Sequence, residues 1–137
     1  MKFLAPAPRG AVNTLAEQGE RVFAEIGCAS CHVPELRTAP SSNPVFDRRP
    51  VRLYSDLLLH DIGTGDEIEQ GAAAPEEIRT PALWGLRLRR PLLHDGSAST
   101  PEAAILRHAN EALRARDKFA ALDPYSRNAL LAFLRSL

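Results

Sequence analysis

Both cysteines of the sequence fall within one stretch of five residues, C-A-S-C-H at positions 28–32. Cys28 and Cys31 are about one helical turn apart, so their sulfurs can reach two substituents on the same edge of a flat molecule. His32 follows directly and can point at the centre of that molecule. This spacing is typical of c-type haem attachment, with thioethers from both cysteines and His32 as the proximal iron ligand.

Two other kinds of site use paired cysteines. A structural zinc site would need a second pair of ligands at metal spacing, and the sequence has no further cysteine to supply it. A thioredoxin-like redox pair would need a βαβ context, and the sequence shows no convincing strand pattern. We therefore predict one haem c, attached covalently through Cys28 and Cys31.

Helical periodicity is clearest near the two ends of the chain. Residues 14–26 carry apolar side chains at helical spacing and end just before the cysteines. The segment 100–112 begins with Thr-Pro, a typical helix start, and its apolar face includes His108. Residues 123–137 begin with Asp-Pro and are strongly apolar. We expect an all-α domain like the class I cytochromes c, with three main helices and long loops that wrap a haem.

Length and charge narrow the domain organisation and the partners. A chain of 137 residues suits a single domain, 1–137, and 17 basic residues balance 17 acidic ones, which argues against nucleic-acid binding. No apolar run approaches the ~20 residues of a membrane span. The first ten residues lack the pattern of a signal peptide. Because this type of haem attachment occurs outside the cytoplasm, we expect a periplasmic or cell-surface protein whose sequence is that of a mature form or a fragment.

The second axial ligand is the main open question about the predicted site. Methionine is a frequent partner of histidine on haem iron, but the only methionine is Met1, which excludes an internal one. His108 is favoured, since an unpaired imidazole on the apolar face of a helix would be costly to bury. A lone histidine on such a face is usually a core residue whose hydrogen bonds are satisfied. The presence of a haem motif in the same chain favours a ligand instead. The remaining candidates are His60, His94, Tyr54, Tyr125 and an open coordination site.

Other side chains can be assigned expected roles around the haem. His60 and His94 each precede an aspartate, with a glycine soon after, which is typical of turns and of hydrogen-bonding histidines. Trp84 is expected to pack at the haem edge, with its indole N–H bonded to a carbonyl or a propionate. One arginine should neutralise a propionate, among Arg79, Arg87, Arg89 and Arg90. A carbonyl should accept the second N–H of His32, presented by Pro34, Pro40 or Pro44.

Four ordered motifs resemble one bacterial family. These are "YSDLLLHDIG", "RTPALWGL", "LLHDGSASTPEAAILRH" and "ALLAFLRSL". Together they look like the C-terminal haem domain of the bacterial di-haem oxidoreductases, also described as thiol oxidoreductases, which are relatives of the di-haem cytochrome c peroxidases. The resemblance covers nearly the whole chain.

The resemblance carries implications for individual residues. The position that holds the distal ligand of the electron-transfer haem in the peroxidases, often methionine, falls on His108, which implies ligation by His32 and His108. His60 and His94 match positions that lie near the haem without binding its iron. The whole enzymes of the family carry two haems, and nothing in this sequence corresponds to the N-terminal domain that holds the peroxidatic one.

Three functions remain open from the sequence. The first is a mono-haem electron-transfer module with two histidine ligands, which serves a redox partner protein or a second haem domain. The second is a peroxidase-like oxidoreductase module in which His108 leaves the iron and His60 or His94 acts as acid and base. The third is an assembly subunit that forms oligomers and stacks haems along a wire. We favour the first, because two strong axial ligands leave no open position for peroxide.

Overall fold

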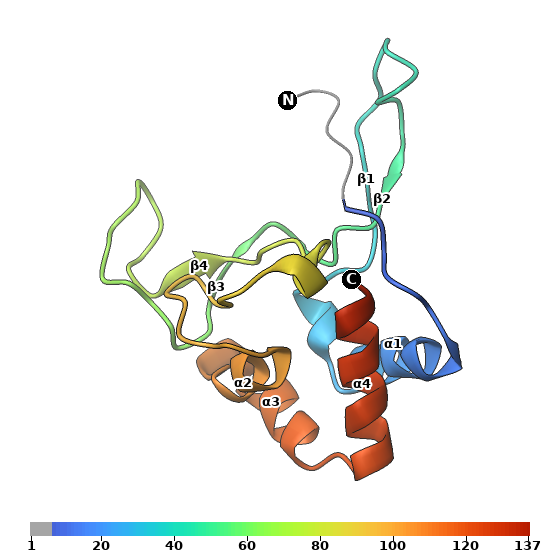
Figure 1. The fold of residues 1–137 in the computed structure, drawn as a ribbon. Coiled ribbons are helices and arrows are strands. Elements are labelled where there is room, and N and C mark those ends of the chain that lie inside the picture. Colours follow the sequence, from blue (N-terminus) through green and yellow to red (C-terminus); the bar gives the residue numbers. More distant parts are fainter. Residues whose placement is uncertain (1–6) are drawn as a thin grey trace.

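The computed structural model describes residues 7–137 (Figure 1). Within these residues it contains four α-helices, three short 3-10 turns and two small antiparallel sheets. In chain order the elements are α1 (Thr14–Glu25), η1 (Cys28–Ser30), β1 (Leu36–Arg37), β2 (Pro50–Val51), β3 (Leu59–Asp61), β4 (Glu77–Arg79), η2 (Leu86–Leu88), α2 (Pro101–Leu106), η3 (Asn110–Ala112), α3 (Leu113–Ala120) and α4 (Pro124–Ser136).

The first helix confirms the expectation for residues 14–26. The Asn13 side chain accepts a hydrogen bond from the backbone N–H of Ala16 at 2.9 Å, and so satisfies one free donor of the first turn of α1. Val22 and Phe23 are almost completely buried on one face of α1. The helix ends next to the cysteine motif, so its packing fixes where the motif lies.

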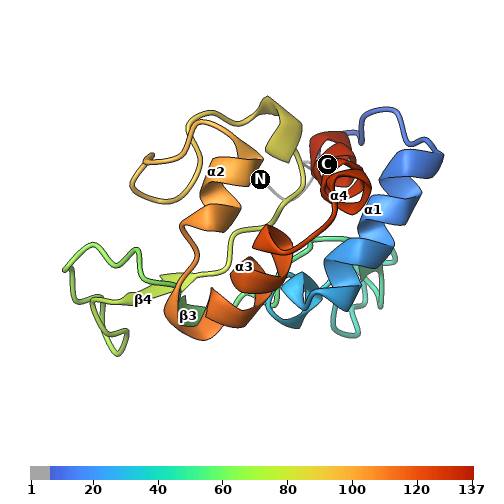
Figure 2. The same cartoon turned by 90° about the horizontal axis from the view of Figure 1, so that it is seen from below.

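The closing helix supplies more of the buried core than any other element. Asp123 caps α4 by accepting the backbone N–H groups of the second and third helical residues, and Pro124 occupies the first helical position. Phe133 is fully buried, and its ring lies edge-on to Phe23 with 5.3 Å between centroids. The helices α1 and α4 therefore form one packed layer (Figures 1 and 2).

The expected all-α fold of the class I cytochrome c type is wrong. Strands β1 and β2 pair antiparallel, and so do β3 and β4, which places His60 opposite Ile78. Each strand has only two or three residues. Strands this short show no alternation of apolar and polar residues, which is why the sequence pattern did not reveal them. The chain is a mixed structure in which two small sheets lie beside the helices (Figure 1).

The expected number of main helices, three, is also wrong. Helix α2 stops at Leu106 and does not continue to residue 112, so His108 lies just beyond its end. A further helix, α3, follows after η3. Its sequence, LRARDKFA, is mostly polar, buries only Phe119, and has no side-chain N-cap, so it carries little of the signal that identifies a helix.

The loops agree more closely with what the sequence predicts. Only the short turn η2 lies between Pro81 and Pro91, as the two prolines predict. The residues between 33 and 53 are irregular apart from the two residues each of β1 and β2. Along residues 7–137, none of the helices combines the length and the apolar character that crossing a membrane would require.

Candidate functional site

The C-A-S-C-H motif lies on a tight turn that follows α1. Gly27 has a φ of 100°, a conformation that few residues other than glycine adopt, and it turns the chain into η1. The backbone N–H of His32 then donates to the carbonyl of Cys28 at 3.0 Å. The turn therefore holds both cysteines and His32 in one compact loop at the end of a rigid helix.

The two cysteines lack the lowered pKa of a redox-active pair. They form no disulfide with each other. Burial raises the pKa of Cys28 to about 11 and also raises that of Cys31. A redox-active pair needs a lowered thiol pKa, so these values argue against a thioredoxin-like function. The sulfur of Cys31 lies with ligand atoms of Asp56 and His60, all within 4.8 Å of one another, but Cys28 does not join that group. The cysteines thus do not converge on one metal position.

His32 is held as a neutral imidazole with one free nitrogen. Its Nδ1 lies 3.0 Å from the backbone carbonyl oxygen of Tyr54, and a carbonyl can only accept, so Nδ1 carries the proton. Burial is the main cause that lowers the pKa of His32 to about 4. The lone pair is therefore on Nε2, the nitrogen suited to bind a metal. The acceptor is Tyr54 and not Pro34, Pro40 or Pro44, so that expectation is wrong.

Tyr54 presents this carbonyl from a strained backbone. Its φ is 52°, in the left-handed region, where a bulky residue is costly. The side chain is 2% exposed, its hydroxyl donates to Glu20 at 2.6 Å, and its ring lies 5.5 Å from that of Phe133. Burial and the bond to Glu20 raise the pKa of Tyr54 to about 12, so the hydroxyl stays protonated. Packing of the ring offsets the strain and keeps the carbonyl aimed at His32.

His108 is held in the same state as His32. Its Nδ1 donates to the carbonyl of Ala104 at 2.8 Å, an acceptor near the end of α2 that also accepts the backbone N–H of Arg107 at 3.2 Å. Its backbone N–H also donates to the carbonyl of Ile105, and these two bonds end the helix. Burial lowers the pKa of His108, so this ring too is neutral with its lone pair on Nε2. The charge of a protonated His108 is a further cause, after burial, of the lowered pKa of His32.

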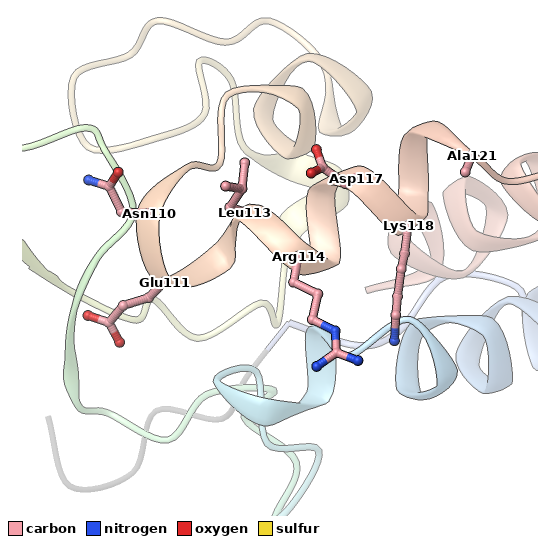
Figure 3. A pocket seen from close by; sticks show the side chains of 7 residues that line it. All are labelled: Asn110, Glu111, Leu113, Arg114, Asp117, Lys118 and Ala121. Carbon is pink, nitrogen blue, oxygen red and sulfur yellow. The ribbon is translucent and has the colours of Figure 1, made fainter.

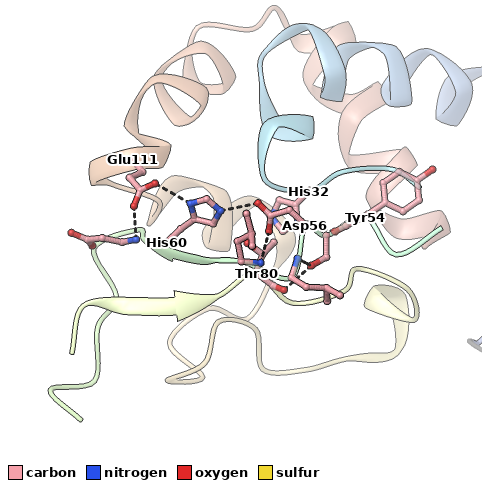
Figure 4. A network of polar contacts seen from close by, with 10 residues as sticks. His32, Tyr54, Asp56, His60, Thr80 and Glu111 are labelled. Atoms are coloured by element: carbon pink, nitrogen blue, oxygen red, sulfur yellow. Dashed lines mark hydrogen bonds and ion pairs between the residues drawn. The ribbon is translucent and has the colours of Figure 1, made fainter. Parts of the chain in front are cut away.

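His60 lies between two carboxylates (Figure 4). Its Nδ1 is 2.9 Å from Glu111 Oε2, and its Nε2 is 2.8 Å from Asp56 Oδ2. These two hydrogen bonds raise the pKa of His60. The bond from His60 lowers the pKa of Glu111, and it also lowers that of Asp56 against the opposing effect of burial. His60 is in β3, so its expected place in a turn is wrong.

The other expected site residues take varied positions. His94 lies in a turn, as expected, 4.0 Å from Asp66. Trp84 is half-buried just before η2. Tyr125 is 63% exposed on α4, with no sign of a buried ligand role. Met1 lies outside the described residues.

The arginines near η2 bind the protein backbone. Arg87 donates to the carbonyl of Pro8, and Arg89 donates to the carbonyls of Ala82 and Trp84. Arg90 donates to the carbonyls of Leu86 and Arg89. Arg79 is exposed at the end of β4. Their role toward a propionate stays a prediction.

An open pocket of about 590 Å³ lies along α3 (Figure 3). Its wall includes Glu111 and two cations, Arg114 and Lys118, whose side chains extend toward the same side of the helix in this view. The sequence suggested no role for these residues, because α3 lacks a strong helical pattern. Arg114 and Lys118 place two positive charges on the surface next to Glu111.

Several residues of the site were missed from the sequence. Asp56 and Glu111 contact His60 but stand 4 and 51 residues from it, and a spacing of 51 residues carries no structural signal. The backbone carbonyls of Tyr54 and Ala104 carry no sequence signal at all, since every residue has one. Only the Asp-x-x-x-His spacing in "YSDLLLHD" could have suggested one of these pairs.

Comparison with known proteins identifies the family. Residues 2–137 match the family described as "Di-haem oxidoreductase, putative peroxidase". The chain is 25% identical over 142 residues to methylamine utilization protein MauG of Methylorubrum extorquens, a match that covers 93% of this chain and 35% of that protein. A chain of hydrazine synthase from Kuenenia stuttgartiensis has a similar fold, with a TM-score of 0.64 and 20% identity over 98% of this chain and 51% of that chain.

The match to the family model extends over almost the entire sequence and confirms the resemblance seen in the four motifs. The chain spans only 35% and 51% of the lengths of these two relatives. It also contains a single C-x-x-C-H motif, whereas the name of the family specifies two haems. The chain belongs to the di-haem oxidoreductase family.

Proposed function

We propose that this chain is an electron-transfer module that carries one haem c. Cys28 and Cys31 would hold the haem through thioethers, and the Nε2 atoms of His32 and His108 would bind the iron from its two sides. When bound, the haem would supply an iron that exchanges one electron between its ferric and ferrous states. The chain belongs to a family of haem oxidoreductases, which supports a haem-dependent redox role.

The observation that carries this proposal is the matched state of the two imidazoles. Each Nδ1 donates to a backbone carbonyl, Tyr54 for His32 and Ala104 for His108. Each ring is neutral at physiological pH because burial lowers its pKa. Iron-binding histidines have this arrangement, in which the second nitrogen is fixed by a carbonyl and the first keeps its lone pair.

The other candidate ligands fit less well. The hydroxyl of Tyr54 stays protonated and donates to Glu20, on the side of the residue away from its carbonyl. Both nitrogens of His60 are already bonded to carboxylates. His94 lies in a turn next to Asp66. The comparison of these candidate side chains therefore supports His108 as the distal ligand.

A peroxidase-like module would need a vacant iron position and a histidine free to accept and donate a proton. His60 is poorly suited to that role, because Asp56 and Glu111 hold both of its N–H groups. Two coordinated histidines also lower the reduction potential relative to a histidine and methionine pair. Outer-sphere electron transfer to a redox partner protein or to a second haem domain fits these features better.

The compartment follows from the same chemistry. Thioether attachment of haem takes place outside the cytoplasm, so we propose a periplasmic or cell-surface location. The partner would be a second haem domain or a separate redox protein, because this chain spans only part of its relatives and carries one haem motif.

Exclusion of carbon monoxide tests this proposal. The haem-loaded wild-type protein, once reduced, is expected to keep its absorption spectrum in saturating carbon monoxide, because His108 occupies the position where the gas would bind. Stopped-flow absorption after the reduced protein is mixed with carbon monoxide measures the rate of adduct formation. Rapid and complete formation of a carbon monoxide adduct would mean an open iron site, as the peroxidase-like function requires.

A further inference from the structure

A continuous path of polar contacts joins the two segments that carry His32 and His108. At one end, the backbone N–H of Asp56 donates to the carbonyl of Cys31 at 2.8 Å. The Asp56 carboxylate then contacts His60, and His60 contacts Glu111, three residues after His108 (Figure 4). The path therefore runs from the residue just before one histidine to the turn that follows the other.

The geometry defines the charge of His60. Both of its nitrogens face carboxylate oxygens, at 2.8 and 2.9 Å, and an ionised carboxylate only accepts hydrogen bonds. Both nitrogens must therefore carry protons, and the ring is an imidazolium between two anions. Charge-assisted bonds of this kind are stronger than neutral ones. The side chains of His60 and Asp56 are 17% and 11% exposed, which limits screening by water on that side, whereas Glu111 is 54% exposed.

Both carboxylate oxygens of Glu111 form hydrogen bonds with residues of strand β3. While Oε2 accepts from His60, Oε1 accepts the backbone N–H of Asp61 at 2.9 Å. The neighbouring residues add two contacts: Ala109 N–H donates to the carbonyl of Ile62, and the Asn110 amide donates to the Asp61 carboxylate. The segment directly after His108 thus makes three contacts with β3 and one with Ile62, the residue after it, and only the bond to His60 joins two charged groups.

The anchoring at the other side of His60 is equally specific. The Asp56 carboxylate accepts the backbone N–H of Leu58 at 3.0 Å as well as the N–H of His60. Ser55, the preceding residue, is fully buried, and its backbone N–H donates to the carbonyl of Val33 at 3.0 Å. Asp56 therefore moves with the motif segment, and Glu111 with the His108 segment.

We propose that His60 is a positioning residue that bridges Asp56 and Glu111, fixes the spacing between the His32 and His108 segments, and thereby keeps His108 on the iron. This inference rests on the proposed function. The bridge gives the predicted haem neighbour a defined task that differs from acid and base catalysis. Weakening it should allow the His108 segment to move away and expose the distal side.

The substitution Glu111→Gln tests the bridge at the His108 side. The glutamine keeps the size of the side chain but removes the anion that His60 faces. In the haem-loaded protein, the rate of carbon monoxide binding to the ferrous form should rise, by no more than the roughly 10- to 100-fold effect of losing a group that contacts a metal ligand directly. Stopped-flow absorption gives the rate, and the ferric spectrum gives the share of high-spin haem.

Glu102→Gln is the matched control. Glu102 precedes His108 by six residues and forms an exposed ion pair with Arg127 at 3.7 Å, so the same chemical change occurs on the same stretch of chain without touching His60. Its carbon monoxide rate and spin state should equal those of the wild type. An equal increase in both variants would attribute the effect to charge loss in general and would overturn the proposal.

Asp56→Asn provides a second variant that acts from the opposite side of the ring. It should open the distal site as Glu111→Gln does, although it lies on the other segment. If either variant folds, as judged by circular dichroism, and binds carbon monoxide no faster than the wild type, the bridge does not hold His108. In a His60→Gln background, adding Glu111→Gln should have little further effect, because the shared contact is already gone.

These outcomes separate two kinds of failure. A wild-type protein that binds carbon monoxide rapidly would contradict the proposed function itself. A wild-type protein that excludes the gas, together with Glu111→Gln and Asp56→Asn variants that exclude it equally, would leave the function intact and remove the role of His60.

Discussion

Replacing His108 by alanine is expected to convert the haem-loaded protein from a low-spin to a high-spin state. The imidazole of His108 is neutral and its Nε2 is free, since Nδ1 donates to the Ala104 carbonyl. Without it, the iron would keep only His32 as a strong protein ligand, and a weakly bound or absent sixth ligand leaves it high-spin. Absorption and electron paramagnetic resonance spectra of the ferric protein measure the change, which should affect nearly all of the haem.

His108→Met is the informative companion to this variant. A thioether would again occupy the distal position, so the haem should return to low spin, and its reduction potential should rise above that of the wild type. Added imidazole should likewise restore the low-spin spectrum of His108→Ala. An alanine variant that stays low-spin without any addition would mean that another residue is the distal ligand.

Replacing Gly19 by alanine should destabilise the fold more than any exposed substitution in α1. A Cβ atom at Gly19 would collide with the carbonyl oxygen of Ala129 on α4 and lie 2.5 Å from its carbonyl carbon and 2.8 Å from Phe133 Cβ. Backbone atoms cannot rotate away, so α1 and α4 must separate. The better helix propensity of alanine contributes at most about 1 kcal/mol in the other direction. We expect the free energy of unfolding to fall by about 3 kcal/mol, the upper part of the range for overpacked cores.

Urea unfolding of the haem-loaded protein measures this loss, and Gln18→Ala is its control in the adjacent position of the same helix. Gln18 makes only a 3.4 Å contact with Arg21 at the surface, so its replacement should change the free energy by no more than about 0.5 kcal/mol. A Gly19→Ala protein as stable as the wild type would mean that the two helices do not approach closely enough for the added methyl group to collide.

The parts of the fold that the sequence predicted are those with strong local signals. Asn13 and Asp123 cap α1 and α4 with their side chains, and apolar residues follow each of them at helical spacing. These local signals predict both helices without information from the rest of the chain. The family could also be predicted from the sequence, because four motifs in a fixed order are specific to it. These features depend on residue type and spacing alone.

The errors arose where the structure depends on particular hydrogen bonds, some of them between distant residues, that the order of residue types does not show. The strands β3 and β4 have three residues each and exist because residues 59–61 pair with residues 77–79. Helix α2 ends early because the His108 ring bonds the Ala104 carbonyl, which a helical projection treats as part of a continuous face. An all-α expectation followed from reading periodicity without these bonds.

The candidate site shows the same division. Its proposed haem ligands were predicted from the sequence, since the C-A-S-C-H spacing and the absence of an internal methionine favoured His32 and His108. Its supporting contacts were not, because Tyr54 contributes through a backbone carbonyl and Glu111 reaches His60 across 51 residues. Such contacts decide how a ligand is held and have no signature in the order of residues.

The central claim is that two histidines close both sides of the haem iron. Low-temperature electron paramagnetic resonance of the ferric, haem-loaded wild-type protein tests it most directly. Ligation by His32 and His108 predicts a spectrum that contains only low-spin signals, without any addition of imidazole. A spectrum dominated by high-spin iron would contradict it.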